Sequence, residues 1–253
     1  MRKFSCALFA FFVVSFARAE WKVVSTQSEF SAGPRIEHRH LVVAAGEEGL
    51  RANLDLAIFS AKTATLQVID NPQGNDSLGT VMSREHSLAG INGGYFDPEF
   101  APVGLSISDG RLVRPQQRAK LLSGVVSAKD GRVVIQRTAE FSMKSKPAAA
   151  RQCGPFLVES GQPIAGLNNE REARRTFVSV SGDRAMLGFC SSVTLAQLAE
   201  ILCIPDLKIS RALNMDGGSS SAFWFGREKG PLYISEQKNV RDFLAIAPQP
   251  AKN

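Results

Sequence analysis

The sequence has few of the residues that most often bind metals or act in proton transfer. It holds three histidines and four cysteines in 253 residues. The histidines are scattered, and no two cysteines have the C-x-x-C spacing of common zinc sites. None of His38, His40 and His86 follows a plausible nucleophile turn, so a Ser-His-Asp triad is disfavoured as well. Acid–base chemistry would therefore fall to carboxylates and arginines.

Several signature motifs are also missing. The chain has no G-x-S-x-G, no H-E-x-x-H, no Walker loop and no dinucleotide-binding fingerprint followed by a helix. No basic run is interleaved with aromatic residues, so we expect no nucleic-acid partner. We expect no cofactor, although a divalent metal stays open.

Only the first 19 residues contain a long apolar run. Met1-Arg2-Lys3 is a positive start, Phe4 to Phe16 is apolar, and Ala17-Arg18-Ala19 has the small-x-small pattern of a cleavage site. This pattern predicts a secretory signal peptide, because the apolar run is shorter than the roughly 20 residues that cross a bilayer. We therefore expect a periplasmic or secreted protein without stable membrane insertion after cleavage.

Cleavage would leave residues 20–253, a length that suits one large or two small domains. It would also lower the formal net charge from +6 to +3, since the leader carries three cations and no acid. Of the three remaining cysteines, Cys153 and Cys190 lie in strand-like runs typical of buried thiols. One disulfide and one odd thiol among Cys153, Cys190 and Cys203 are possible in an oxidising compartment, but the pairing and the oligomeric state stay open.

Short runs with apolar residues at every second position recur along the chain and predict strands. Turn signals at Asp109-Gly110, Asp130-Gly131 and Gly182-Asp183 separate several of them. Two helices are expected, over 77–87 and 193–202, and 144–150 is the only linker-like stretch. We predict an α+β fold, a single domain of mixed, mostly antiparallel β-sheets with a few flanking helices. The strands are expected at 53–59, 64–69, 103–108, 121–127, 132–136, 153–158, 176–180 and 185–190.

Two segments share one design, in which an apolar run ends in a polar residue and two glycines. They are Ala89 to Asp97, which contains Asn92-Gly93-Gly94, and Ala212 to Ser221, which contains Asp216-Gly217-Gly218. Glycine lacks a Cβ and accepts positive φ, so the backbone can come close to another group. The pair predicts two walls of one polar site.

Asp216 is the strongest single candidate for chemistry. A carboxylate at the end of an apolar strand is partly desolvated, which raises its pKa, whereas nearby N–H and hydroxyl donors lower it. An Asp that only hydrogen-bonds its own turn is the alternative. Asn92, Asp97 and the aromatic Tyr95 and Phe96 belong to the first loop, where an ordinary tight turn is equally possible.

Arginine offers a planar fork suited to phosphate or carboxylate. Arg175 enters a predicted strand and is the candidate for such a contact, whereas we expect Arg174 to be a solvated surface residue. The basic stretch from Arg111 to Lys120 is expected to be a solvated hairpin and its following loop.

Taken in order along the chain, these segments resemble the phosphodiester glycosidase family. The resemblance covers about residues 50–247 and includes a Gly104 to Gly110 hairpin, a Gly154 to Val158 strand and Arg175-Thr176. The second loop departs from the family pattern, since Met215 and Ser219 replace a leucine and a third glycine. The motifs that carry the resemblance are Asn92 to Asp97, the 194–202 helix and Asn214 to Ser220.

The resemblance implies hydrolysis of a sugar that is joined through its anomeric carbon to a phosphodiester, so the expected partner is a sugar-phosphate or glycan substrate. Asp216 would act as nucleophile or electrostatic stabiliser, Arg175 would hold phosphate, Asn92 would orient the substrate, and Asp97 would be a second carboxylate. The expected substrate-binding residues are Gly93, Gly94, Tyr95, Thr176, Gly217, Gly218, Ser219 and Ser220.

Two other functions stay open. One is a non-catalytic protein that binds glycans or assembles exopolysaccharide. The other is a divalent-metal phosphodiesterase that uses Asp97 and Asp216 as ligands, although clustered carboxylates are scarce in the sequence.

Overall fold

The computed structural model describes residues 20–32, 36–46 and 49–249 of the chain. The predicted signal peptide at residues 1–19 lies outside this part. The described residues form three β-sheets and two short α-helices. None of these helices is long and apolar enough to cross a membrane.

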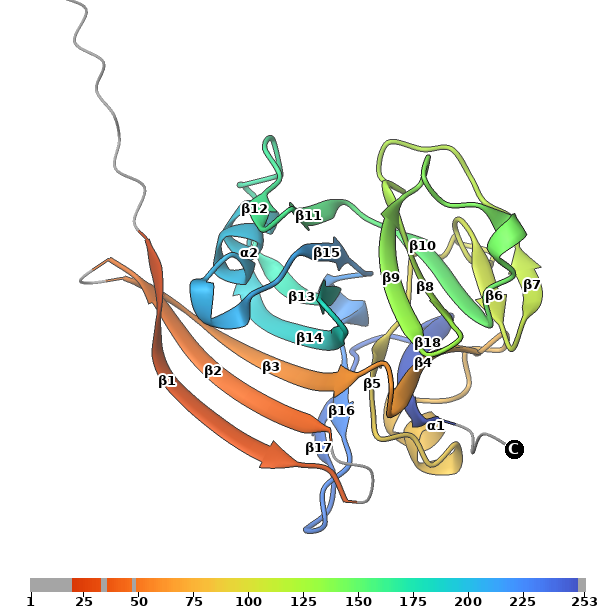
Figure 1. Cartoon of the computed structure of the whole chain (residues 1–253), viewed down its shortest axis with the longest axis horizontal. Helices are drawn as coiled ribbons and strands as arrows, with labels where there is room; N and C mark the ends of the chain where they lie inside the picture. Colours follow the sequence, from red (N-terminus) through yellow and green to blue (C-terminus); the bar gives the residue numbers. More distant parts are fainter. Residues whose placement is uncertain (1–19, 33–35, 47–48, 250–253) are drawn as a thin grey trace, which may run out of the picture.

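The large sheet has eight strands, and the other two sheets have five each. Figure 1 shows the long, curved strands of the large sheet on one side, the second sheet on the other, and the third sheet where they meet. In order across the large sheet, the strands are β1 (Trp21–Phe30), β2 (Glu37–Ala45), β3 (Leu50–Ser60), β14 (Arg184–Val193), β13 (Ala173–Ser181), β15 (Arg211–Asn214), β11 (Phe156–Glu159) and β12 (Gln162–Pro163).

The two smaller sheets use strands from the middle and the ends of the sequence. The second sheet has the order β7 (Arg111–Arg114), β6 (Ser106–Ser108), β10 (Ala149–Cys153), β8 (Gly124–Lys129) and β9 (Arg132–Arg137). The third has the order β17 (Leu232–Ile234), β16 (Phe223–Phe225), β5 (Ala89–Asn92), β18 (Asp242–Pro248) and β4 (Ala64–Asp70).

Alternating burial along a strand shows which of its faces meets the core. In β4, Ala64, Leu66 and Val68 are buried while the residues between them are partly exposed, so one face of the strand meets the core. Buried side chains from all three sheets form one apolar cluster. A second cluster fills the space between the large sheet and α2 (Leu195–Leu202).

Local capping explains where α2 begins. Thr194 accepts a hydrogen bond from the Gln197 N–H, and the Gln197 side chain accepts one from the Thr194 N–H, which forms a capping box. Leu198, Ala199 and Leu202 are buried against the sheet, as the apolar spacing predicts. The other helix, α1 (Leu78–Arg84), has Ser77 as its cap. Three 3-10 turns complete the elements, at Met143–Ser145, Pro205–Leu207 and Gly218–Ser220.

The fold is richer in β-structure than an α+β class implies. All strand pairs in the described part are antiparallel, so the expectation of mixed sheets is wrong. The predicted strand at 153–158 is broken at Gly154-Pro155 and belongs to two sheets, as β10 and β11. The linker-like stretch at 144–150 is a 3-10 turn that leads directly into β10.

The alternation of apolar and polar residues in the sequence does not predict β1 and β2. β1 lies at the edge of the large sheet with most of its residues exposed, and β2 begins with the polar run Glu37 to His40. The exposed edge strand β1 has no apolar period to detect, whereas β2 shows one only after its polar start, at Leu41, Val43 and Ala45.

The three cysteines in the described part are free thiols, with Cys153 and Cys190 buried. Burial raises the pKa of the Cys153 thiol to about 12 and that of Cys203 to about 11. These thiols are therefore protonated at neutral pH and are poor nucleophiles.

A fully buried ion pair joins the second sheet to the third. Arg151 of β10 donates from Nε to Asp242 Oδ2 at 2.9 Å, and neither side chain is exposed to solvent. Its two terminal nitrogens donate to the carbonyl oxygens of Tyr95 at 2.7 Å and Val103 at 2.9 Å. Asp242 in turn accepts the Gly94 N–H at 2.9 Å. The charges are thus matched and hydrogen-bonded, which a buried pair requires.

Arg151→Met is expected to lower the free energy of unfolding by about 3–5 kcal/mol, because it leaves the Asp242 charge buried without a partner. Urea unfolding monitored by fluorescence measures the change. The matched control is Lys62→Met, which removes an exposed pair with Asp183 and should cost less than about 1 kcal/mol. Equal losses in the two variants would contradict the central role of the buried pair.

Candidate active site

The two glycine loops touch each other. Asn92 ends β5, and Asp216 lies two residues beyond the end of β15. The Asn92 side-chain amide donates to the Asp216 carbonyl oxygen at 2.7 Å, and the Asp216 N–H donates to the Gly93 carbonyl oxygen at 3.1 Å. The sequence places these residues far apart, and the packing of the third sheet against the large sheet brings them together.

Asn92 is used entirely within the protein. Its Oδ1 accepts from the Thr176 hydroxyl at 2.9 Å and from the Ala222 N–H at 3.1 Å, and its side chain is fully buried. Thr176, also fully buried, lies 2.9 Å from the Asp216 carbonyl oxygen as well. In this arrangement Asn92 and Thr176 position the Asp216 loop, and neither offers a free polar atom to a ligand.

The first-loop glycines approach the buried ion pair. A Cβ on Gly93 would lie 1.6 Å from Asp242 Oδ1, and one on Gly94 would lie 2.5 Å from the Arg151 guanidinium carbon. Both N–H groups donate to Asp242, at 2.7 Å to its carbonyl and 2.9 Å to its carboxylate. The close approach inferred from the sequence exists, but its partner in the structure is the protein's own core.

The Asp216 carboxyl is partly buried and still reachable. Burial raises its pKa above the ordinary value, while a hydrogen bond from Ser220 at 2.5 Å, the charge of Lys238 and the Gly217 N–H oppose the rise. Gly218 follows in the sequence, with a φ of 67°, and a Cβ added to it would meet no atom within 4 Å. The neighbouring Ser219 is exposed. Asp216 itself is half-buried, and the two residues that follow Gly217 border open space.

Arg175 of β13 is a buried cation with an unusual environment. Its side chain donates from Nε to the Val193 carbonyl at 3.1 Å and from Nη2 to the Arg171 carbonyl at 2.7 Å, and the residue is only 8% exposed. Among the described residues, no carboxylate lies within ion-pair distance of it. Its Nη1 lies 3.5 Å from the position that a Cβ on Gly217 would occupy. Burial lowers its pKa, so an anion beside Nη1 would relieve the cost of the buried charge.

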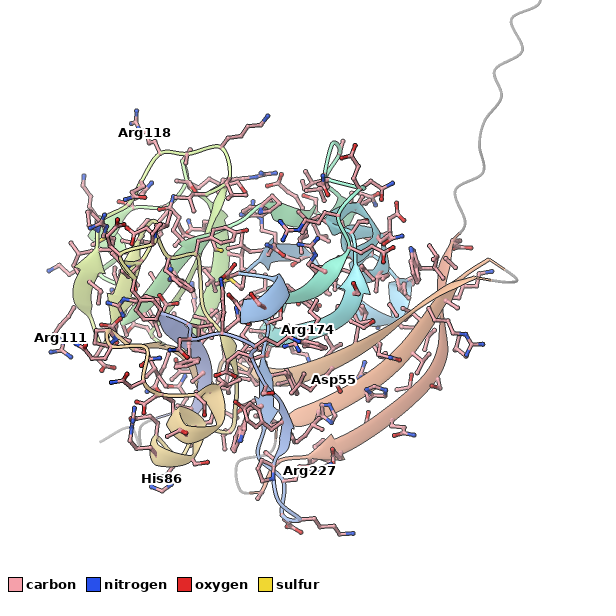
Figure 2. The ribbon with its side chains drawn as sticks, turned by 180° about the vertical axis from the view of Figure 1, so that it is seen from behind. Asp55, His86, Arg111, Arg118, Arg174 and Arg227 are labelled. Carbon is pink, nitrogen blue, oxygen red and sulfur yellow. The ribbon has the colours of Figure 1, made fainter. Side chains whose placement is uncertain are left out.

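Arg174 is not the solvated surface residue that we expected. It donates to the carbonyl oxygens of Ser221 and Ser235, and its own carbonyl accepts from the Ser221 hydroxyl at 3.0 Å. Figure 2 shows Arg174 at the centre of the view, among the strands. It fastens the end of the Asp216 loop to the segment that follows β17.

Sequence reasoning missed Lys238. Its Nζ lies 4.8 Å from the centre of the Phe96 ring, and its charge lowers the pKa of Asp216. The Gln237 N–H donates to the Ser219 carbonyl at 2.7 Å, which holds this segment over the loop. No motif surrounds Lys238 in the sequence, so only the packing of the chain identifies it as a cation of the site.

The other aromatic and acidic candidates of the first loop have partners of their own. The Tyr95 hydroxyl donates to the Gly154 carbonyl at 2.6 Å, and burial raises its pKa. Phe96 packs edge-on against Phe100. Asp97 Oδ1 accepts the Ala101 N–H at 2.8 Å, so this carboxylate closes its own turn and makes no hydrogen bond to the Asp216 loop.

Histidines do not contribute to this site. His38 Nε2 and His40 Nδ1 each lie 3.0 Å from Asp55 Oδ1, and Asp55 belongs to β3 of the large sheet (Figure 2). His86 follows α1. Within the part of the chain that the structure describes, no group of three or more histidine, cysteine or acidic residues is arranged to hold a metal ion.

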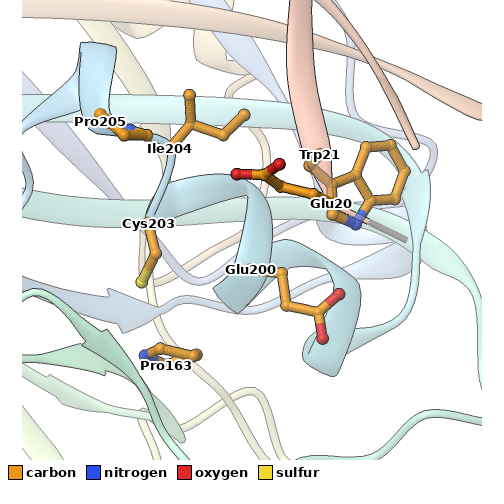
Figure 3. A pocket seen from close by; sticks show the side chains of 7 residues that line it. All are labelled: Glu20, Trp21, Pro163, Glu200, Cys203, Ile204 and Pro205. Carbon is orange, nitrogen blue, oxygen red and sulfur yellow. The ribbon is translucent and has the colours of Figure 1, made fainter. Parts of the chain in front are cut away.

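A cavity of about 310 Å³ lies beside the end of α2, where Trp21, Cys203 and Pro205 line it (Figure 3). It shares no residue with the two glycine loops. The candidate site is therefore defined by its polar groups and not by this cavity.

Comparison with known proteins identifies a family that matches this chain. A family model for phosphodiester glycosidases matches residues 85–247. None of the curated proteins matches the chain.

Solved structures with similar folds share little sequence with this chain. The zebrafish N-acetylglucosamine-1-phosphodiester alpha-N-acetylglucosaminidase catalytic domain, auto-inhibited by its pro-peptide, has a TM-score of 0.65 and 15% identity over 88% of each chain. A hypothetical protein from Synechocystis has a TM-score of 0.59 and 12% identity over 90% of this chain and 68% of that one. A Burkholderia pseudomallei protein described as exported has a TM-score of 0.56 and 12% identity over 78% and 74%. At these identities the matches show the fold.

Asp216→Asn is expected to stabilise the protein at pH 7. A raised pKa means that the folded protein holds this proton more tightly than the unfolded chain does, so wild-type stability falls as pH rises from the ordinary value of 3.8 through the raised value. The variant carries no charge to bury, and its advantage should therefore disappear below pH 3.8.

Urea unfolding at a series of pH values tests this, with Asp183→Asn as the control at an exposed turn. An advantage of Asp216→Asn that is the same at every pH would contradict the electrostatic explanation.

Proposed function

Because this chain belongs to the phosphodiester glycosidase family, we propose that it hydrolyses the bond between the anomeric carbon of a sugar and a phosphodiester oxygen. One observation carries the proposal beyond the family. A buried arginine without a carboxylate partner lies against the loop that presents a partly buried carboxylate. A sugar phosphodiester supplies an anion for the first group and a cation-like carbon for the second.

The reaction breaks the bond from the anomeric carbon to the phosphate oxygen and forms a bond from that carbon to a water oxygen. The electron pair leaves with the phosphate oxygen, so the products are a free sugar and a phosphomonoester. A phosphate oxygen leaves without full protonation. The barrier therefore lies in the positive charge on the sugar and the negative charge on the departing group.

Asp216 acts on the sugar. Asp97 closes its own turn and Asp242 is held in the buried ion pair, so Asp216 is the carboxylate that this site offers to a ligand. Its negative charge stabilises the cation-like anomeric carbon or attacks it as a nucleophile. Either role needs the ionised form, so activity should fall as pH drops through the raised pKa of Asp216.

Arg175 and Lys238 act on the phosphate. Arg175 Nη1 faces Gly217, and Lys238 lies over the Phe96 ring, with its charge felt at Asp216. Charge-assisted hydrogen bonds from these cations strengthen as the phosphate gains charge, which favours the transition state over the bound substrate.

We place the enzyme in the periplasm or outside the cell, since residues 1–19 have the pattern of a signal peptide. The substrate would then be a sugar phosphodiester of envelope or exopolysaccharide glycans.

The direct test is turnover of the methyl diester of N-acetylglucosamine-1-phosphate in ¹⁸O-labelled water. We expect free sugar that carries the label at the anomeric oxygen, together with unlabelled methyl phosphate. Asp216→Ala should lower kcat/KM by at least about a hundredfold, as loss of a group that stabilises transition-state charge does. Asp183→Asn is the folded control and should retain activity.

Three other outcomes would contradict the proposal. Label in the phosphate would indicate a phosphodiesterase. Binding of the diester without turnover would favour a glycan-binding or assembly protein. Loss of activity after chelation, restored by a divalent cation, would indicate a metal-dependent reaction.

Arg175→Gln tests the phosphate contact without turnover. Inorganic phosphate should raise the Tm of the wild type, because a ligand that binds only the folded state stabilises it. The Tm of the variant should not respond to phosphate, whereas Lys62→Gln should respond like the wild type. A phosphate response that persists in Arg175→Gln would remove Arg175 from the binding site.

A further inference from the structure

A basic segment lies outside the site described above. The stretch from Arg111 to Lys120 contains four cations, and residues 110–129 contain no Asp or Glu. None of these four side chains forms an ion pair with any residue in the described part of the chain. We expected a solvated hairpin and loop. Solvation explains why these basic side chains are exposed, but it does not explain why no acidic residue lies near them in the sequence.

The loop that follows β7 is held at two points by one buried residue. The Gln152 side chain, fully buried in β10, donates to the carbonyl oxygens of Gln117 at 2.8 Å and Leu122 at 3.2 Å. Its Oε1 accepts the Gln117 N–H at 3.1 Å. Arg118 and Lys120 lie between these anchors and are exposed, and Figure 2 shows Arg118 pointing away from the molecule. The cations are thus presented on a loop whose ends are fixed.

These cations line a groove. A cavity of about 880 Å³ lies between residues 116–123 and residues 137–141, which together we call the basic groove. Arg118, Lys120 and Arg137 line it, together with the small polar residues Ser123 and Thr138. Arg137 pairs with Glu159 at 2.6 Å, so the uncompensated charge in the groove belongs to Arg118 and Lys120.

The basic groove is connected to the candidate active site through one peptide group. A Cβ on Gly154 would lie 2.1 Å from the Leu121 carbonyl oxygen, so the groove loop lies directly against Gly154. The Gly154 carbonyl oxygen accepts from Tyr95 at 2.6 Å and from Asn214 at 3.0 Å, and both of these residues belong to the segments of the two glycine loops. The groove loop therefore packs against the same residue that holds the segments of the two glycine loops.

We propose that the basic groove binds a phosphodiester-linked polymer, the part of the substrate that remains attached to the phosphate after the sugar leaves. This inference rests on the proposed function. The phosphates of such a polymer carry the charge that complements two cations held on a fixed loop. The small hydroxyl-bearing residues of the groove suit a hydrated polyol backbone.

Nucleic acid fits less well. Single-stranded nucleic acid binds by stacking its bases on aromatic side chains, and Phe141, the aromatic residue among those that line the groove, is buried.

The test compares binding of the full chain and two double variants to poly(glycerol phosphate), measured by calorimetry at low and at moderate salt. Arg118→Gln/Lys120→Gln should bind about tenfold more weakly, because two charge-assisted contacts are lost, and its affinity should depend less on salt. Lys62→Gln/Lys229→Gln makes the same change in net charge at exposed sites outside the groove and should bind like the wild type.

Equal weakening in the two double variants would overturn the proposal, because it would show attraction by net charge alone. Tighter groove-dependent binding to duplex DNA or to phosphatidylglycerol vesicles would overturn the assignment of the ligand. Poly(glycerol phosphate) carries no sugar to be released, so the measurement reports on the groove whether or not the proposed hydrolysis is observed. Matching urea midpoints confirm that the variants are folded.

Discussion

The candidate site depends on the buried ion pair between Arg151 and Asp242. Two charges without solvent are stable only when every donor and acceptor around them is satisfied. Arg151 meets that condition by binding Asp242 and the carbonyl oxygens of the loops around it, and Asp242 by accepting the Gly94 N–H. The pair therefore fixes β10 against β18 and also fixes the backbone just after Asn92. Any larger residue at the two glycines would push the pair apart.

From this pair a continuous chain of hydrogen bonds leads to the backbone of Asp216. The backbone of Gly93 accepts from Asp216, Asn92 donates to the Asp216 carbonyl, and Thr176 binds Asn92. The polar atoms of this chain are used to hold the loop. The groups left for a ligand are the Asp216 carboxylate and the side chains of Arg175 and Lys238. This division between positioning groups and reactive groups is expected of a site that must hold its geometry while charge moves.

The sequence predicts the parts of the site that depend on local pattern. Apolar runs that end at Asn92 and near Asp216 are visible as β5 and β15, and the capping box of α2 is a local signal. The partners of those residues are not visible. The glycines at 93 and 94 indicate that the backbone comes close to another group, but they do not identify that group. In the structure the group is Asp242, about 150 residues away in the sequence. Lys238 and Arg174 enter the site only through the packing of separate segments, which no period or motif in the sequence encodes.

The two perturbed charges of the site have a common explanation. Burial disfavours the charged form of Asp216 and the charged form of Arg175, and the two do not neutralise each other as an ion pair. A protein selected only for stability would bring such groups together or expose them. Kept apart, each lacks a counter-charge, and the proposed sugar phosphodiester would supply one during bond cleavage, a cation-like carbon for Asp216 and a phosphate for Arg175. In the proposed reaction, the stability lost in the free protein becomes binding energy, which is recovered most fully when the substrate's own charges separate.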